Sequence, residues 1–114
     1  PAPVGPYSQA VVCGDLVFCS GQLGLDPATG AMAEGAVAQA RQALANLQAV
    51  LQAAGSSLDR AIKVTVYMTD LAHFPEVNKA YADFFEPPFP ARTAIQVAAL
   101  PKGGEVEIDV IALR

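Results

Sequence analysis

The sequence is poor in charged residues and has no tryptophan. Lys, Arg, Asp and Glu make up only 16% of its 114 residues, against roughly 25% in an average globular domain. Hydrophobic residues account for 53%, which excludes a disordered chain. We expect one domain over residues 1–114. Because a domain of this size leaves much of its surface exposed, we also expect some apolar surface to be buried against further copies of the chain.

The shortage of basic residues and the lack of long apolar runs narrow the choice of partners. A net charge of −4 provides no excess of positive charge that would attract nucleic acid or anionic lipid. The longest uncharged stretch, residues 42–58, is interrupted by Gln and Asn and is no membrane span. No basic, apolar signal peptide opens the sequence, and Pro1 indicates a processed or trimmed start. We therefore expect no membrane association and a cytoplasmic location.

Two cysteines are present, Cys13 and Cys19. They fall on the two strands of a predicted hairpin that turns at residues 14–15. Simple pairing places Cys13 opposite Leu16 and Cys19 opposite Ala10, so we expect small core residues and no disulfide.

Hydrophobic periodicity predicts the remaining elements. Apolar residues recur at steps of three and four between Val37 and Ala54, which predicts a helix that Gly55 ends. Pro75 suits the first turn of a second helix, and Pro87 stops it. The order of these two helices and the predicted strands along the chain predicts a two-layer α/β sandwich with both helices on one face of a mixed sheet. The predicted strands are residues 11–13, 16–19, 61–68, 92–97 and 106–113.

The last two predicted strands alternate apolar and polar residues. If both apolar faces lie under the helices, Arg92 and Glu107 project together from the opposite face of the sheet. One interpretation is a solvated face with minor ion pairs. The other is a cleft, in which Arg92 offers a planar fork to a ligand carboxylate and Glu107 orients or deprotonates a water. That pair would suit chemistry on a small 2-keto or 2-imino acid.

The spacing of this pair leaves a difficulty. A plain hairpin of the last two strands pairs Gln96 with Glu107 and leaves Arg92 four residues away, or about 13 Å at roughly 3.3 Å per residue. Shifted strands, another segment or a second subunit would have to complete such a site, and these alternatives stay open.

Other candidate residues have two interpretations each. Ser20 is either a site hydroxyl or a loop hydroxyl that binds its own backbone, and Tyr7 is either a site residue or an aromatic cover of the sheet edge. Gly21 would let a ligand approach the backbone closely. Because His73 is the single histidine, no multi-histidine cluster is available and we expect no metal site.

Six short motifs follow one another along nearly the whole chain. They are Gly5-Pro6-Tyr7-Ser8-Gln9-Ala10, Ser20-Gly21-Gln22, Val77-Asn78 with Tyr81, Phe89-Pro90-Ala91-Arg92, Leu100-Pro101-Lys102-Gly103 and Val106-Glu107-Ile108. Together, in this order and spacing, they resemble the RidA (YjgF) family of reactive-intermediate deaminases.

The resemblance implies a fold and a reaction. The fold is a chorismate-mutase-like α/β sandwich with a mixed six-stranded sheet, assembled as a homotrimer around a central barrel with active sites in the clefts between subunits. The reaction is hydrolysis of 2-imino acids and their enamine tautomers, such as 2-aminoacrylate and 2-aminocrotonate, to 2-keto acids and ammonium. The resemblance implies that no cofactor is needed.

The resemblance also implies roles for particular residues. Arg92 would clamp the substrate carboxylate, and Glu107 would position and activate the attacking water. Some relatives carry Cys where this chain has Ala94, which argues against a required thiol. The other implied site residues are Tyr7 and Ser20, which would orient water or the imine nitrogen, Gly21 and Ala94, which would present backbone groups, and Asn78 at the pocket rim.

Two rival functions remain to be weighed. Members of this family have also been described as translation-inhibiting endoribonucleases and as chaperone-like binding proteins, and the net charge of −4 weighs against RNA as the main substrate. An N-terminal proline can serve as a base in small trimeric tautomerases, but Pro1 precedes the motifs that carry the resemblance.

Overall fold

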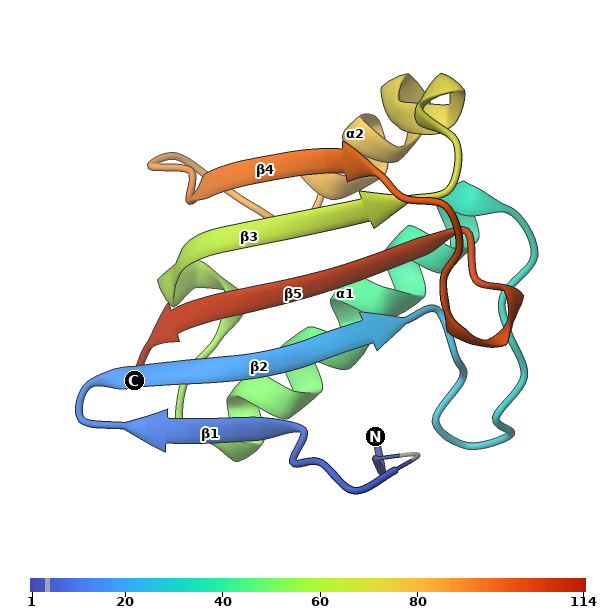
Figure 1. The fold of residues 1–114 in the computed structure, drawn as a ribbon. Helices are drawn as coiled ribbons and strands as arrows, with labels where there is room; N and C mark the ends of the chain where they lie inside the picture. The colour runs from blue at the N-terminus through green and yellow to red at the C-terminus, as the bar shows by residue number, and fades with distance from the viewer. Residues whose placement is uncertain (4) are drawn as a thin grey trace.

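The computed structural model describes residues 1–3 and 5–114. In these residues five strands form one sheet in the order β1-β2-β5-β3-β4, where the resemblance implied six. Both helices pack behind the sheet, so one of its faces is covered and the other is open (Figure 1). The elements are β1 (Ala10–Cys13), β2 (Leu16–Leu23), α1 (Ala36–Ala53), β3 (Ala61–Met68), α2 (Phe74–Ala82), β4 (Ala91–Gln96) and β5 (Val106–Leu113), with 3₁₀ turns at Leu58–Arg60, Leu71–His73 and Pro101–Gly103.

The periodic segments confirm their predictions closely. β3 and β5 have the predicted bounds, and α1 is displaced by one residue. Leu44, Leu47 and Leu51 of α1 are fully buried against the sheet, because their spacing places them on one face of the helix. The two-layer α/β prediction is therefore correct.

The predicted hairpin between the last two strands is wrong. β4 pairs in parallel with β3, and β5 lies antiparallel between β2 and β3. The β3-α2-β4 segment is a crossover unit, which brings two consecutive strands side by side in parallel. β5 lies at the centre of the sheet, because only a central strand can bury its apolar residues so completely. Four of them are at most 1% exposed: Val106, Ile108, Val110 and Ala112.

The predicted facing of Arg92 is wrong as well. Arg92 lies opposite the buried Val64, so it projects from the helix-covered face. Glu107 lies opposite Tyr67, one residue out of phase with the buried positions, so it projects from the open face. On edge strand β4 the outward position is taken by Ile95, while the long side chain of Arg92 runs along α2, as an amphipathic side chain can.

The first hairpin has the predicted register. Ala10 pairs with Cys19 and Cys13 with Leu16, and both cysteines are free. Cys19 is a core residue, and its burial raises the pKa of the thiol to about 11. The prediction was wrong for Cys13, which is exposed beside the turn.

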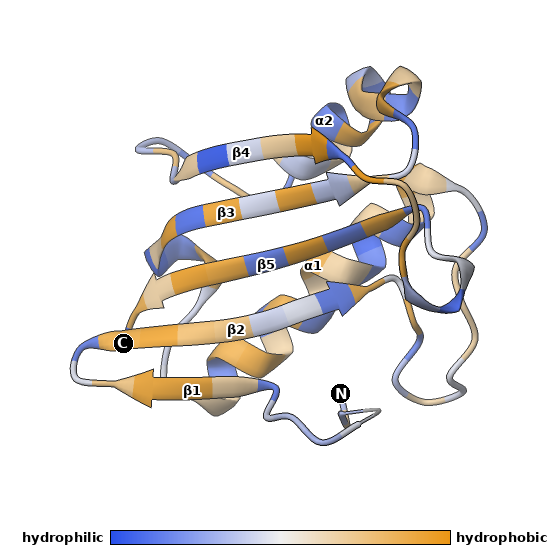
Figure 2. Cartoon of the chain, viewed as in Figure 1, coloured by the Kyte–Doolittle hydropathy of each residue, from blue (hydrophilic) through white to orange (hydrophobic). Residues whose placement is uncertain are grey.

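The open face carries apolar side chains that nothing in the described chain covers. They include Val11 and Phe18, which are 55% and 42% exposed, together with Ile95 and Leu113. Figure 2 shows hydrophobic residues along all the strands, with polar residues gathered near the ends of β2 and β5 that lie beside each other. Within the described residues, no helix combines the length and the hydropathy needed to cross a membrane.

Candidate functional site

Two clefts hold most of the predicted site residues. The first, here called the Glu107 cleft, has a volume of about 410 Å³ and is lined by Tyr7, Ser20, Gly21 and Glu107 among others. The second, here called the Arg92 cleft, is also about 410 Å³ and is lined by Asn78, Tyr81, Ala82, Phe89, Pro90 and Arg92. The structure therefore divides the predicted site into two parts.

A β-bulge shapes the Glu107 cleft. The register between β2 and β5 shifts between Cys19 and Gln22, so that Ser20 and Gly21 form an irregular step in β2. Such bulges re-aim side chains near functional sites. The backbone at Gly21 passes so close to the carboxylate that a Cβ added there would lie 2.7 Å from Glu107 Oε2. Any larger residue at position 21 would therefore have to displace the Glu107 carboxylate.

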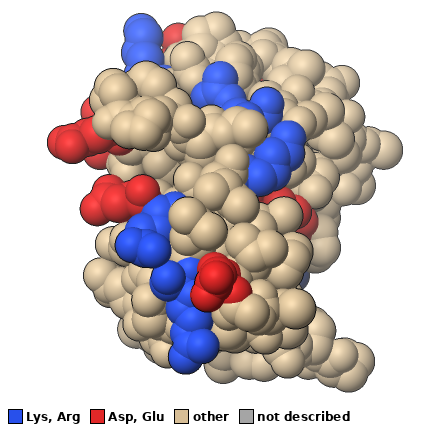
Figure 3. All heavy atoms as spheres, turned by 90° about the vertical axis from the view of Figure 1, so that its left-hand side faces the viewer, with Lys and Arg blue, Asp and Glu red and all other residues tan. Residues whose placement is uncertain are grey.

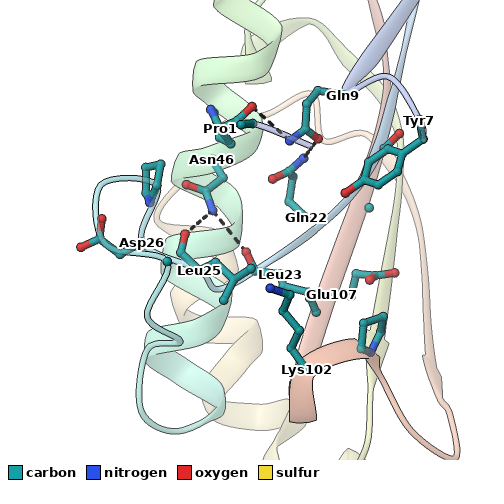
Figure 4. A pocket seen from close by; sticks show the side chains of 16 residues that line it. Pro1, Tyr7, Gln9, Gln22, Leu23, Leu25, Asp26, Asn46, Lys102 and Glu107 are labelled. Atoms are coloured by element: carbon teal, nitrogen blue, oxygen red, sulfur yellow. Dashed lines mark hydrogen bonds between the residues drawn. The ribbon is translucent and has the colours of Figure 1, made fainter. Parts of the chain in front are cut away.

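Two hydroxyl side chains line the same cleft as this carboxylate. Ser20 Oγ donates to the Ser8 carbonyl at 2.6 Å, which orients the hydroxyl and leaves its oxygen able to accept a hydrogen bond. Tyr7 is 43% exposed, and Figure 4 shows its ring on the same side of the cleft as Glu107. A single copy of the chain thus brings four predicted site residues together around one cleft: Tyr7, Ser20, Gly21 and Glu107.

The environment of Glu107 makes its carboxyl a weaker acid than an exposed glutamate. Partial burial raises the pKa of the Glu107 carboxyl above its ordinary value, and the neighbouring Asp109 carboxylate raises it further. Asp109 is itself engaged, because Tyr67 Oη donates to its Oδ2 at 2.9 Å. Glu107 and Asp109 are both half-buried, although they project from the open face of the sheet.

Asn46 and Lys102 also line the Glu107 cleft, and the sequence did not single them out. Asn46, on α1, is 3% exposed and donates to the carbonyls of Leu23 and Leu25, which fixes the end of β2 (Figure 4). Lys102 has a φ of 57° in the turn before β5. A positive φ is uncommon for a residue other than glycine. For Lys102 the available signal was its place in the Leu100-Pro101-Lys102-Gly103 motif, whereas Asn46 is one of several polar residues of α1 and carried no comparable signal.

In the Arg92 cleft, neighbouring side chains hold the guanidinium group of Arg92 in place. Arg92 Nη1 donates to Asn78 Oδ1 at 2.7 Å. The guanidinium carbon lies 4.7 Å from the ring centroid of Tyr81 and 5.3 Å from that of Phe74. Ala94 follows on the same face of β4 and packs against the core. Since Arg92 has five N–H donors, several remain for a ligand.

Arg92 and Glu107 cannot meet on one small ligand within a single chain. Across the sheet, Glu107 of β5 is aligned with Tyr67 of β3 and with Ile95 of β4. Ile95 is three residues along β4 from Arg92, and β5 is two strand spacings away from β4. With roughly 3.3 Å per residue and about 4.8 Å between strands, their Cα atoms are about 14 Å apart. The two side chains also leave opposite faces of the sheet. Of the alternatives that the sequence left open, a shifted hairpin is excluded.

A metal centre finds no support in the described part of the chain. Residues 1–3 and 5–114 contain no group of three or more His, Cys, Asp or Glu side chains that could hold a metal ion. The two clefts offer carboxylates, hydroxyls, side-chain amides, an ammonium group and a guanidinium.

Comparison with known proteins first defines the class. A crystal structure of RidA from Psychrobacter sp. PAMC 21119 superposes with a TM-score of 0.97 at 50% identity, covering 100% of this chain and 93% of the other. A crystal structure of Escherichia coli TdcF with bound serine gives a TM-score of 0.94 at 41% identity, covering 100% and 92%. The fold is that of a RidA-type α/β domain.

Residues 1–114 match the profile of the family described as Endoribonuclease L-PSP. The chain belongs to this family, which is the RidA (YjgF) family, as the six motifs indicated. The chain is also 50% identical to the 2-iminobutanoate/2-iminopropanoate deaminase of Bos taurus over 115 aligned residues, covering 100% of this chain and 84% of the relative.

Proposed function

We propose that this protein hydrolyses short 2-imino acids to 2-keto acids and ammonium, as the name of the bovine relative describes for that protein. The observation that carries the proposal is the half-buried Glu107 carboxylate, which lies against the backbone of Gly21 in a cleft that the hydroxyls of Tyr7 and Ser20 also line. Such a cleft offers a base and room for a water. The serine bound to TdcF is a small amino acid, which agrees with a substrate of this size.

The site is completed by a second copy of the chain. Arg92 and Glu107 leave opposite faces of the sheet, so one small substrate can meet both only where two copies adjoin. The open face supplies apolar side chains for such an interface, among them Phe18 and Val11. The family resemblance supports a homotrimer, with its sites between subunits, as the form of this assembly.

The reaction follows from the chemistry of the imine. The carbon of the C=N bond is already electrophilic because it adjoins a carboxylate, so the protein must mainly fix orientation and supply a base, and no cofactor is required. Arg92 binds the carboxylate edge-on through its remaining N–H groups. Glu107 takes a proton from water as the water oxygen bonds to the imine carbon and the electron pair of the C=N π bond moves to nitrogen, and it then gives that proton to the nitrogen to form the carbinolamine. Glu107 next takes the hydroxyl proton of the carbinolamine and passes it to the nitrogen as the C–N bond breaks, so that ammonia leaves, takes up a proton from solvent as ammonium, and the 2-keto acid remains.

The raised pKa of Glu107 suits this role. A carboxylate that holds a proton more readily than usual is a stronger base toward water and returns the proton to the leaving nitrogen. Tyr7 and Ser20 orient the water or the nitrogen. Gly21 and Ala94 offer backbone groups, and Asn78 acts from the rim through its hydrogen bond to Arg92.

An endoribonuclease role has weaker support. Figure 3 shows Lys and Arg side chains in a broken band with Asp and Glu side chains beside it, not a continuous basic surface. The chain has 7 basic and 11 acidic residues. A phosphate backbone would find few uncompensated cations there.

The test is hydrolysis of an imine generated in place. A dehydratase releases 2-aminoacrylate or 2-aminocrotonate, semicarbazide traps the free imine, and keto-acid formation is followed with each variant. We expect the wild type to compete with the trap and Arg92→Ala and Glu107→Gln to lose this competition. The matched controls Lys79→Ala and Glu76→Gln, both at exposed positions of α2, should behave as wild type. A folded wild type that leaves the trap unaffected would refute the proposal.

A further inference from the structure

Arg92 rests on one face of α2. Phe74, Asn78 and Tyr81 are spaced by four and three residues, which places them on the same side of the helix. All three contact Arg92: the two rings lie within 5.3 Å of its guanidinium carbon, and the Asn78 side-chain oxygen accepts from Nη1. We call these three residues the α2 support face.

Tyr81 is the best-anchored member of this face. Its side chain is buried, at 7% exposure, and its ring stacks on Phe85 with a centroid distance of 4.4 Å. Its hydroxyl is buried and has no hydrogen-bond partner in the described chain. The ring is therefore held by packing alone, and the contact that it offers to Arg92 is the ring face.

We propose that Tyr81 is a positioning residue for Arg92, which holds the guanidinium so that its free edge meets a substrate carboxylate. The inference rests on the proposed function, in which Arg92 binds that carboxylate. An aromatic ring contacts the flat face of a guanidinium, whereas a carboxylate binds in its plane, so both contacts form at once. A long side chain that is already held loses less rotamer freedom when the ligand binds.

A purely structural role for Tyr81 predicts something different. If the ring only filled the core, its loss would lower the stability of the fold and leave the behaviour of Arg92 unchanged. If the ring acts through Arg92, its loss affects the order of the guanidinium and the affinity for a carboxylate. These two roles are separated by measuring Arg92 directly.

The first experiment needs no ligand. The ¹⁵N relaxation order parameter of the Arg92 Nε–H group is measured in wild type, Tyr81→Phe and Tyr81→Leu. We expect Tyr81→Phe to match the wild type, because it keeps the ring face, and Tyr81→Leu to show a clearly lower order parameter. Val77→Ala is the matched control, because Val77 is buried on α2 at 1% exposure and is not one of the three residues of the α2 support face. An unchanged order parameter in Tyr81→Leu would overturn the proposal.

The second experiment measures affinity. Calorimetric titration with 2-oxobutanoate, a short 2-keto acid, should give about fivefold weaker binding for Tyr81→Leu, equivalent to the roughly 1 kcal/mol of a cation–π contact. KM should rise by a similar factor with kcat unchanged. In an Arg92→Met background, Tyr81→Leu should have no further effect on the affinity for 2-oxobutanoate or on KM, because the guanidinium that Tyr81 positions is absent.

The outcomes distinguish this inference from the function on which it rests. If the wild type binds no keto acid and hydrolyses no imine but Tyr81→Leu still loosens Arg92, the proposed function fails and the positioning role stands. If the wild type binds and hydrolyses normally and Tyr81→Leu alters neither the order of Arg92 nor the affinity, the positioning role fails alone.

Discussion

Substitution of Gly21 by alanine should separate activity from stability. The added Cβ would lie 2.7 Å from Glu107 Oε2, 2.8 Å from Cδ and 3.1 Å from Cγ. Ordinary contact begins at about 3.4 Å, so the carboxylate must move by at least about 0.7 Å. A misplacement near 1 Å at a reacting group can cost on the order of 100-fold in rate. We therefore expect kcat to fall by about 10- to 100-fold.

The same substitution should cost little stability. The obstructing atoms belong to the end of a flexible side chain, and replacing glycine by alanine gains about 0.4–1 kcal/mol through the unfolded chain where the backbone is compatible. Gly24→Ala is the contrasting control, because its Cβ would lie 2.5 Å from the backbone Cα of Gln39. Thermal unfolding should place Gly21→Ala near wild type and Gly24→Ala well below it. Full imine hydrolysis by Gly21→Ala, or a loss of stability equal to that of Gly24→Ala, would refute the reasoning.

Two further predictions concern stability. Burial raises the pKa of Glu107 in the folded chain above its ordinary value of 4.5. The folded chain therefore binds this proton more tightly than the unfolded chain does, and it loses stability as the pH rises from 4.5 through the folded-state pKa. Glu107→Gln should therefore unfold at a higher temperature than wild type at pH 7, and the difference should shrink as the pH falls toward 4.5 and be absent below it in a melting series; a constant difference would contradict this. Asn46→Ala should lower the free energy of unfolding by about 2 kcal/mol, because two carbonyls, those of Leu23 and Leu25, lose their donor. Denaturant titration measures this, with Gln52→Ala on the exposed side of α1 as a control that should be neutral.

The sequence predicted local structure well and strand pairing poorly. The alternation in β3 and β5 defines their bounds because burial on one face imposes a period of two. The neighbour of each strand depends on contacts distant in sequence, which alternation does not report, so β5 was placed beside β4 and not between β2 and β3.

The candidate site shows the same division. Tyr7, Ser20, Gly21 and Glu107 were identified by their motifs and do line one cleft. The facing of Arg92 could not be read from alternation, because edge strand β4 leaves Ile95 exposed and places the Arg92 side chain along α2. A strand that is not enclosed on both sides carries too weak a hydropathy signal to tell its two faces apart.

The opposite facing of Arg92 and Glu107 has a consequence for how the protein behaves when it is scarce. A site shared between copies exists only while the copies stay together, so dilution below the dissociation constant of the assembly removes activity even though each chain remains folded. Equally, a mixture of chains lacking Arg92 with chains lacking Glu107 regains a site wherever an intact half from each adjoins. Under the proposed sharing, the amount of the protein in a cell would set both the number of sites and the fraction that are whole.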